Sequence, residues 1–200
     1  LSTAIIILGI GVILIFVASP KYAQFALMGI AGACFMGIFL ALESYRLERL
    51  AIWRNPEKYE KGYQTLQGLY AIGSGGVFGV GIGNSVQKLG FVPEAQNDMI
   101  FSIICEELGL AGAGIIVFLF LLLIWRFFLI ASGSRDLFGA LIATGAMAHM
   151  MIQVILNIAV VTNTIPNTGI TLPFISYGGT SVMFLLIEMG LVLSVSQVVD

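Results

Sequence analysis

Long apolar runs, separated by short polar breaks, account for most of the chain and predict membrane-spanning helices. A helix crosses about 30 Å of hydrocarbon with roughly 20 apolar residues. Five runs reach or approach that length, namely residues 1–18, 22–42, 99–131, 137–161 and 180–199. The third is longer than one straight span, so we expect its first turns to stand outside the hydrocarbon. The pattern predicts an all-α polytopic membrane protein with five transmembrane helices.

The charged residues are concentrated between the second and third runs, which divides the chain into three parts. Residues 1–42 are expected to form two spans, and residues 99–200 three spans with a re-entrant-like outer loop at 162–179. Residues 43–98 hold 12 of the 20 charges and form a large loop. Lysine and arginine mark cytoplasmic connections, and the short connections after the first and third runs carry them. The large loop is therefore expected on the extracytoplasmic side.

Composition restricts the class of protein. Hydrophobic residues make up 58% of the chain and charged residues 10%, whereas ordinary soluble chains have about 25% charged residues. These values exclude a soluble domain, and they exclude intrinsic disorder, which needs low hydrophobicity and high net charge. A formal charge of −2 leaves no electrostatic argument for a nucleic acid partner. Cys34 and Cys105 lie within apolar runs and are interpreted as small buried hydrophobes.

Two parts of the large loop have distinct patterns. Residues 43–61 mix apolar and charged positions, which favours a short amphipathic helix at the membrane surface with Trp53 at the headgroup level. Residues 73–83 contain six glycines, and no nucleotide-binding glycine motif can be written there. Such a density permits re-entrant or closely packed backbone. At membrane depth, either arrangement is tolerated only where the backbone is buried in protein or lines a cavity.

Acidic residues lie where the third run begins. Pro93 suits a helix start, and Glu94 and Asp98, four residues apart, would share one face of that helix. One interpretation is a helix-start acid with a solvated neighbour. The other is functional, because Asp98 stands where the chain enters lipid and ionisable groups are costly there. For Glu106 and Glu107 the sequence leaves open a place near the interface, pairing with a cation, or catalysis.

Polar positions also recur inside the later runs. Every fourth residue of one stretch is polar: His149, Gln153 and Asn157. This stripe must face protein or a cavity, and hydrogen bonding between helices is the favoured interpretation. A lone histidine makes a poor metal site. Glu188, in the middle of the last run, needs a partner inside the bundle or a water-filled cavity.

The connection before the last run combines turn-forming residues with apolar ones. Residues 165–179 read IPNTGITLPFISYGG. A loop in water would have no need of the apolar stretch Leu-Pro-Phe-Ile. We therefore expect this loop to fold back against the spans and to line a cavity.

Two long motifs in the chain resemble a known family. Residues 62–114, GYQTLQGLYAIGSGGVFGVGIGNSVQKLGFVPEAQNDMIFSIICEELGLAGAG, resemble the large extracytoplasmic loop of the shape, elongation, division and sporulation (SEDS) family. Residues 165–181, IPNTGITLPFISYGGTS, are similar to the same family's last outer loop. Within the first motif, GVGIGNSVQKLG resembles the division and sporulation branch (FtsW and SpoVE) more than the rod-elongation branch (RodA).

The resemblance implies a fold, an activity and partners. Members of the family have ten spans in the bacterial cytoplasmic (inner) membrane, of which this chain would hold the last five. They polymerise lipid II into glycan strands, and a class B penicillin-binding transpeptidase and divisome or sporulation proteins are the implied partners. The family's catalytic acid falls on Asp98. Its usual surroundings, Thr-Asp-Phe-Ile-Phe, are Asn-Asp-Met-Ile-Phe in this chain.

The implied reaction gives the site residues their predicted roles. A sugar hydroxyl attacks the anomeric carbon of a donor that carries undecaprenyl pyrophosphate, and Asp98 is predicted to take the hydroxyl proton as general base. Positive groups must offset the charge of the leaving pyrophosphate; Lys88 is the first candidate, followed by Arg54, Lys58 and Lys61. A divalent cation, Mg²⁺ or Mn²⁺, could do the same, and no metal ligand is assigned. Substrate binding is assigned to Glu94, Lys88, Gln96, Ser176 and Tyr177.

Two other functions fit the sequence. A lipid-sized cavity with polar residues at membrane depth would also suit a lipid II flippase. A non-catalytic scaffold would hold a single-span class B penicillin-binding protein through helix faces rich in small residues. Loss of polymerisation on changing Asp98, with complex assembly intact, separates a polymerase from a scaffold. Movement of labelled lipid II across liposome bilayers tests the flippase.

Overall fold

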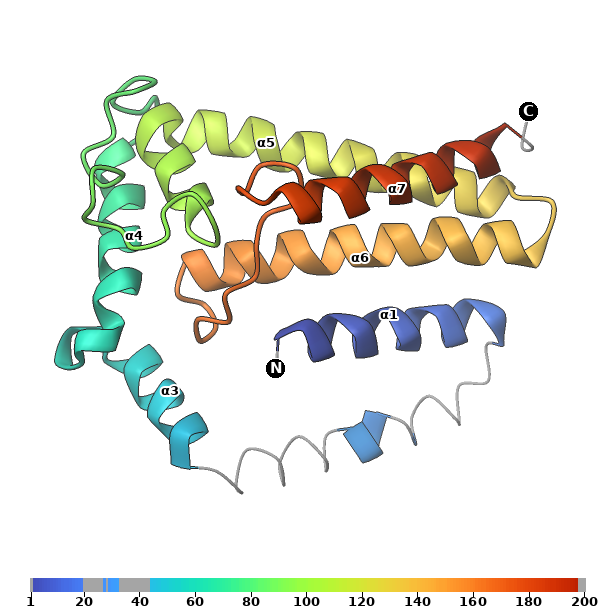
Figure 1. Ribbon diagram of the computed structural model, residues 1–200, viewed down its shortest axis with the longest axis horizontal. Coiled ribbons are helices and arrows are strands. Elements are labelled where there is room, and N and C mark those ends of the chain that lie inside the picture. Colours follow the sequence, from blue (N-terminus) through green and yellow to red (C-terminus); the bar gives the residue numbers. More distant parts are fainter. Residues whose placement is uncertain (1, 20–26, 28, 33–43, 198–200) are drawn as a thin grey trace.

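The computed structural model describes residues 2–19, 27, 29–32 and 44–197, and every regular element in that part of the chain is helical. The all-α fold class is confirmed there. Figure 1 shows α1, α5, α6 and α7 running alongside one another, with α3 and α4 at one end. The α-helices and 3-10 helices (η) are α1 (Ser2–Ala18), α3 (Ser44–Arg54), η1 (Pro56–Lys58), η2 (Glu60–Gly62), α4 (Tyr63–Gly75), α5 (Ile100–Gly133), α6 (Leu137–Val161) and α7 (Gly179–Ser196).

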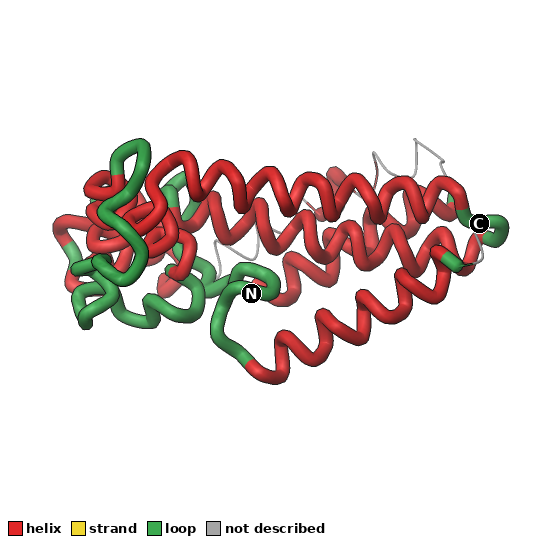
Figure 2. Tube along the Cα trace, turned by 90° about the horizontal axis from the view of Figure 1, so that it is seen from above, coloured by secondary structure: helices red, strands yellow, loops and turns green. Residues whose placement is uncertain are grey.

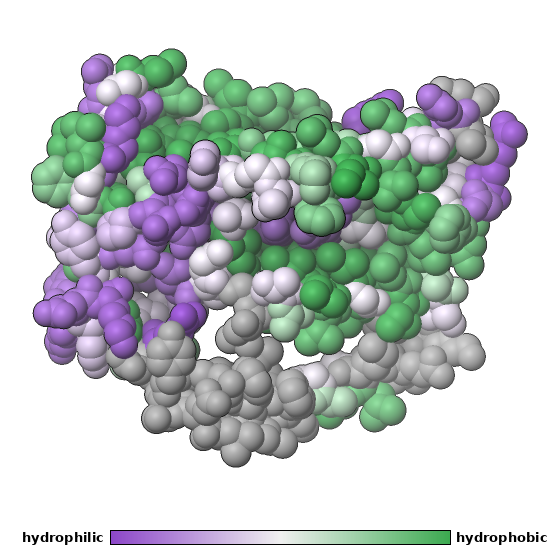
Figure 3. Space-filling view, viewed as in Figure 1, coloured by the Kyte–Doolittle hydropathy of each residue, from purple (hydrophilic) through white to green (hydrophobic). Residues whose placement is uncertain are grey.

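Among the described residues, three helices are long and apolar enough to cross a membrane: α5, α6 and α7. α1 is apolar but shorter, over Thr3–Ala18. Figure 3 shows apolar side chains over this bundle and polar side chains gathered over the end that carries α3 and α4. α1, α6 and α7 closely match the predicted runs 1–18, 137–161 and 180–199. The predicted run 22–42 lies largely outside the described residues, so the count of five spans stays a prediction.

Loops and short helices gather at the ends of the bundle, as Figure 2 shows. α3, α4 and the loop between α6 and α7 lie at one end, and the turn between α5 and α6 lies at the other (Figure 1). The large loop and the 162–179 loop, which were predicted to share a side of the membrane, are therefore at the same end of the bundle. The assignment of that end to the extracytoplasmic side stays a prediction.

α5 is broken near its start at Gly109, whose φ of 66° and ψ of −171° are not helical. The glycine-rich backbone over residues 76–81 packs against this break, which is one of the two arrangements that its glycine density permits. Four backbone hydrogen bonds join the two segments: Val80 N–H to Glu106 C=O (2.9 Å), Gly81 N–H to Glu107 C=O (3.0 Å), Leu110 N–H to Gly76 C=O (2.9 Å) and Ala111 N–H to Val77 C=O (3.0 Å). The break sets the first turns of α5 apart from the long straight part of the helix.

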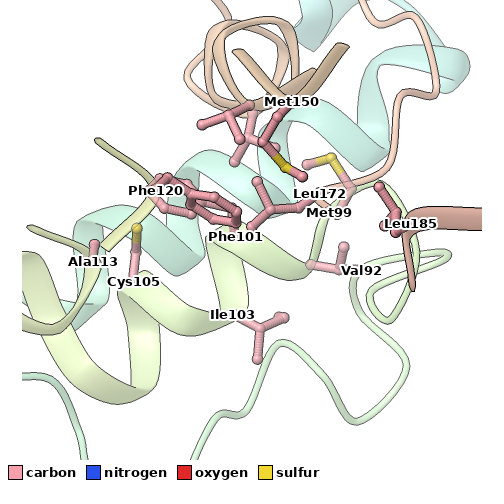
Figure 4. Close-up of a cluster of buried hydrophobic side chains, with 12 residues drawn as sticks. Val92, Met99, Phe101, Ile103, Cys105, Ala113, Phe120, Met150, Leu172 and Leu185 are labelled. Atoms are coloured by element: carbon pink, nitrogen blue, oxygen red, sulfur yellow. The ribbon is translucent and has the colours of Figure 1, made fainter. Parts of the chain in front are cut away.

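The main cluster of buried apolar side chains lies around the start of α5 (Figure 4). Met99 and Phe101 meet Met150 of α6 and Leu172 of the following loop in this cluster, and all four are buried. Removing such a side chain from water contributes about 1.5–3 kcal/mol. The cluster therefore fixes the start of α5, α6 and the loop after α6 relative to one another.

Two predicted elements differ from the structure. The amphipathic helix predicted over 43–61 ends at Arg54, and two 3-10 turns follow it. Pro93 does not start a helix: residues 91–99 form turns, Glu94 has a φ of 54°, and α5 begins at Ile100. The prediction that Glu94 and Asp98 share a helical face is therefore wrong. The physical reason is that this segment is held by hydrogen bonds from distant parts of the chain.

Candidate active site

A cavity of about 310 Å³ opens at the polar end of the bundle, where α3, α4 and the loop after α6 meet. A volume of this size is at the lower end of the range for small-molecule sites. Asp98 supplies the carboxylate of the lining, and most of the other lining side chains are polar. The lining residues are Arg49, Ile52, Trp53, Lys61, Gln64, Thr65, Asp98, Asn163, Asn167, Thr168 and Gly169.

Asp98 is nearly buried, with 9% of its surface exposed. Its Oδ1 accepts a hydrogen bond from Gln64 Nε2 at 3.3 Å. Burial raises the pKa of the Asp98 carboxyl above its ordinary value, and the charge of Glu94 acts in the same direction. Hydrogen bonds from its own backbone and from Gln64 oppose this rise in pKa. Because its charged form is poorly solvated, this carboxylate is a stronger proton acceptor than an exposed one.

Arg49 and Lys61 give the cavity positive charge. Arg49 comes from α3, and its Nη1 donates a hydrogen bond to a carbonyl of the loop after α6 at 3.3 Å. Lys61 lies in the turn that precedes α4. Lys88, the first predicted cation, is outside the cavity lining, and its Nζ pairs with Glu107 Oε1 at 2.5 Å. The structure thus brings Asp98 together with Arg49 and Lys61, not with Lys88.

Glu106 and Glu107 hold the turn that follows the glycine-rich segment. Glu106 is 3% exposed and accepts hydrogen bonds from Ser85 Oγ and from the Val86 N–H, the latter at 3.1 Å. Glu107 binds Lys88 of the same turn. Neither acid lines the cavity of Asp98. Of the alternatives that the sequence left open, the structure supports pairing with a cation for Glu107, whereas Glu106 binds a hydroxyl and a backbone N–H group.

The other predicted substrate-binding residues lie outside the cavity lining. Glu94, Gln96 and Tyr177 are exposed, whereas Ser176 is buried. The Tyr177 N–H donates to the Gln96 carbonyl at 2.8 Å, and Ser176 Oγ donates to the Asn97 carbonyl at 2.6 Å. These bonds tie the loop after α6 to the segment before α5. A contact with substrate stays a prediction for each of the four.

Some residues that shape the cavity were not predicted as site residues. Gln64, which contacts Asp98, also accepts a hydrogen bond from Asn167 Nδ2 at 3.4 Å through its Oε1. The two belong to the first and second motifs, and this membership was their only signal in the sequence. Trp53, predicted at the headgroup level, lines the cavity, and its Nε1 donates to the Asn163 carbonyl at 2.9 Å.

The polar residues of the α6 stripe make contacts in two different parts of the structure. His149 Nδ1 lies 2.8 and 3.0 Å from the carboxylate oxygens of Glu188 on α7, which confirms the predicted bonding between helices and gives Glu188 its partner. Both residues, with Gln153, line a second cavity of about 390 Å³ among α1, α6, α7 and the loop after α6. Asn157 instead donates to two backbone carbonyls near the first cavity.

Metal binding has limited support among the described residues. They contain no group of three His, Cys, Asp or Glu side chains placed to hold a metal ion. Mg²⁺ is commonly held by one or two carboxylates together with substrate phosphates. Asp98 is the side chain in the cavity that could contribute to such a shared site.

Comparison with known proteins identifies the family to which the chain belongs. The model of the family described as "Cell cycle protein", which covers FtsW, RodA and SpoVE, matches residues 1–200. The chain belongs to the FtsW, RodA and SpoVE family. This is the SEDS family, and the resemblance of the two sequence motifs is confirmed. Because α5, α6 and α7 are long and apolar enough to cross a membrane, this family member is a membrane protein.

The named relatives are about twice as long as this member of the FtsW, RodA and SpoVE family. Stage V sporulation protein E of Bacillus subtilis is 44% identical over 200 residues, which are 98% of this chain and 54% of that protein. The probable peptidoglycan glycosyltransferase FtsW of Coxiella burnetii is 42% identical over 188 residues, 92% of this chain and 50% of that protein. The chain spans about half the length of these relatives, whose names are those of the predicted branch.

Two solved structures share the fold. A chain of a peptidoglycan synthase complex, studied for the structural coordination of polymerization and crosslinking, matches with a TM-score of 0.80 and 28% identity. The match covers 98% of this chain and 55% of that one. A mutant of the rod shape determining protein RodA from Thermus thermophilus matches with a TM-score of 0.51 and 34% identity, over 65% of this chain and 39% of its own.

Proposed function

We propose that the full-length protein is a peptidoglycan glycosyltransferase of the bacterial inner membrane that polymerises lipid II into glycan strands during cell division or sporulation. The observation that carries this proposal is the cavity at the polar end of an apolar bundle, where the nearly buried Asp98 shares the lining with Arg49 and Lys61. The names of the FtsW relatives support the reaction class. A lipid-linked sugar would lay its polyprenyl chain along the apolar helices and present its sugar and pyrophosphate at the cavity.

Asp98 acts as the general base in this proposal. The acceptor hydroxyl gives its proton to the Asp98 carboxylate while its oxygen forms a bond to the anomeric carbon of the donor. The bond from that carbon to the pyrophosphate oxygen breaks, and the electron pair leaves with undecaprenyl pyrophosphate. Because pyrophosphate is a good leaving group, no general acid is required. Burial, which raises the pKa of the Asp98 carboxyl, favours the proton transfer.

Arg49 and Lys61 offset the charge of the pyrophosphate. Both line the same cavity as Asp98 and come from segments on either side of η1. A guanidinium can bind two phosphate oxygens at once, and an ammonium adds a point charge. These cations would stabilise the leaving group as negative charge develops on it. A divalent ion shared between Asp98 and the substrate phosphates would supply the same stabilisation.

The direct test uses the full-length protein purified with its class B penicillin-binding transpeptidase. The complex is incubated with lipid II, and the products are separated on a gel. Ladders of glycan strands are the expected result. Absence of ladders from a correctly assembled complex would overturn the polymerase. Transfer of labelled lipid II across liposome bilayers would then identify a flippase, and normal assembly without either activity would identify a scaffold.

The cations of the cavity give a second prediction. Lys61→Ala in the full-length protein is expected to lower kcat/KM for lipid II about 10-fold, because a charged contact with the pyrophosphate is lost. Lys61→Arg keeps the charge and should stay close to the parent. Lys88→Ala is the rival variant, since Lys88 is bound to Glu107 outside the cavity. A fall in kcat/KM for Lys88→Ala, with none for Lys61→Ala, would favour the assignment made from the sequence.

We also propose the class B transpeptidase as the partner, in company with divisome or sporulation proteins. The support is the structural match to a chain of a peptidoglycan synthase complex in which polymerization is coordinated with crosslinking. Co-purification of the full-length protein with the transpeptidase of the same genome tests this. Elution of the two proteins in separate fractions, when they are purified in detergent, would contradict this partnership.

A further inference from the structure

The segment that carries Asp98 is held by hydrogen bonds on three consecutive carbonyl groups. Each carbonyl accepts from a residue far away in the sequence: Gln96 from the Tyr177 N–H at 2.8 Å, Asn97 from Ser176 Oγ at 2.6 Å, and Asp98 from Asn157 Nδ2 at 2.8 Å. The donors come from α6 and from the loop that follows it. This set of contacts fixes the backbone of the candidate base to two other elements.

These external bonds replace the helical ones that the segment lacks. Residues 91–99 form turns, and α5 begins only at Ile100. Buried carbonyl groups need partners, and those of Gln96, Asn97 and Asp98 find theirs outside the segment. The position of Asp98 therefore depends on side chains from elsewhere in the fold.

Asn157 joins the base to the loop beside it. It is 0% exposed, and its Nδ2 donates to the carbonyls of both Asp98 (2.8 Å) and Ile170 (2.7 Å). Gly169, next to Ile170, lines the cavity, and a side-chain carbon placed there would lie 3.9 Å from Asp98 Oδ2. One side chain on a long helix thus sets the spacing of two parts of the cavity.

Ser176 makes the second side-chain contact. It is 7% exposed, and its Oγ accepts the Leu172 N–H at 2.7 Å while donating to the Asn97 carbonyl. The hydroxyl therefore closes the turn of its own loop and joins that turn to the residue before Asp98. Neither Ser176 nor Asn157 lines the cavity. Their contacts with the segment 96–98 connect both residues to Asp98.

We propose that Asn157 and Ser176 are positioning residues that hold Asp98 where it can accept the hydroxyl proton, an inference that rests on the proposed function. A catalytic group displaced by about 1 Å can lose about 100-fold in rate. Ser176 thereby has a role different from the substrate contact that the sequence suggested. Asn157 has a role beyond the packing of helices.

The test measures kcat and KM for lipid II in the full-length protein bound to its transpeptidase. Asn157→Leu, which removes both N–H donors, and Ser176→Ala are each expected to lower kcat about 10- to 100-fold and to leave KM within about threefold. Ser176→Thr keeps the hydroxyl and should recover most of the rate. Thr144→Val is the control, because Thr144 is a buried polar residue of α6 about 20 Å along the helix from Asn157.

Each outcome decides the proposal. A variant that gives less folded protein but an unchanged kcat per folded molecule would show a merely structural role and overturn the proposal. A raised KM with a normal kcat for Ser176→Ala would make Ser176 a substrate contact and overturn its positioning role. If Asn157→Leu does not fold, the comparison of Ser176→Ala with Ser176→Thr decides alone. Full activity of the variants beside an inactive Asp98→Asn would overturn the positioning role only. An inactive parent, or an active Asp98→Asn, would overturn the proposed function and this inference with it.

Discussion

Asp98→Asn in the full-length protein is expected to lower the rate of lipid II polymerisation about 100- to 10,000-fold. The amide has nearly the same size as the carboxylate and can stay beside Gln64, but it cannot accept the proton of the attacking hydroxyl. The measurement is the rate of glycan formation by equal amounts of folded complex.

In the parent, the rate should fall as the pH is lowered, with a midpoint above the pKa of an exposed aspartate, because burial raises the pKa of the Asp98 carboxyl.

The same variant is expected to be at least as stable as the parent at neutral pH. A carboxyl whose pKa is raised on folding destabilises the folded state, because its charged form is less favourable there, at every pH above that raised pKa. The cost disappears as the pH falls through the raised pKa, where the folded state takes up a proton. Asparagine carries no charge at any pH. The Tm of Asp98→Asn should therefore equal or exceed that of the parent near pH 7, and the difference should shrink on acidification.

A matched control separates the general loss of a carboxylate from the loss of this one. Glu60 is an exposed carboxylate outside the cavity lining. Glu60→Gln should therefore polymerise lipid II at the rate of the parent. Polymerisation by Asp98→Asn at that same rate would remove Asp98 from the mechanism.

The long helices could be predicted because the length of an apolar run is a local property of the sequence. α6 occupies residues 137–161 as predicted, and α7 begins one residue before the predicted run. The segment 93–98 could not be predicted in this way. Its turns are fixed by Asn157 and Ser176, which lie 59 and 79 positions away from the residues whose carbonyls they bind. Local propensity favoured a helix there, and tertiary hydrogen bonds determined the outcome.

The cations show the same limit of sequence reasoning. Lys88 was the first candidate because it is close to Asp98 in the sequence. The turn that carries it is bound by Glu106 and Glu107, and this directs the Lys88 ammonium to Glu107. Arg49, from the separate helix α3, lines the cavity. Asp98 was a functional candidate because of its place where the chain enters lipid, and its predicted role as catalytic acid came from the family motif, which encodes a spatial arrangement that hydrophobic periodicity does not.

Gly109→Ala is expected to destabilise the full-length protein by more than about 3 kcal/mol or to prevent its folding. With a φ of 66° and a ψ of −171°, this position lies in a region that residues with a side chain rarely adopt. A Cβ there would lie 2.4 Å from both the Gly79 nitrogen and the Val77 oxygen, which are backbone atoms and cannot rotate away. The yield of folded protein and the Tm in detergent measure the effect.

Gly114→Ala is the matched control in the same helix, because a Cβ at Gly114 would meet no atom within 4 Å. Alanine in a helix interior is favoured over glycine by about 0.5–1 kcal/mol, so Gly114→Ala should keep or raise the Tm. Helix propensity alone predicts a gain for both variants. Opposite shifts would therefore trace the effect at Gly109 to the break in α5, that is, to its positive φ and to the backbone of residues 76–81 packed against it. A Tm of Gly109→Ala equal to that of the parent would contradict that packing.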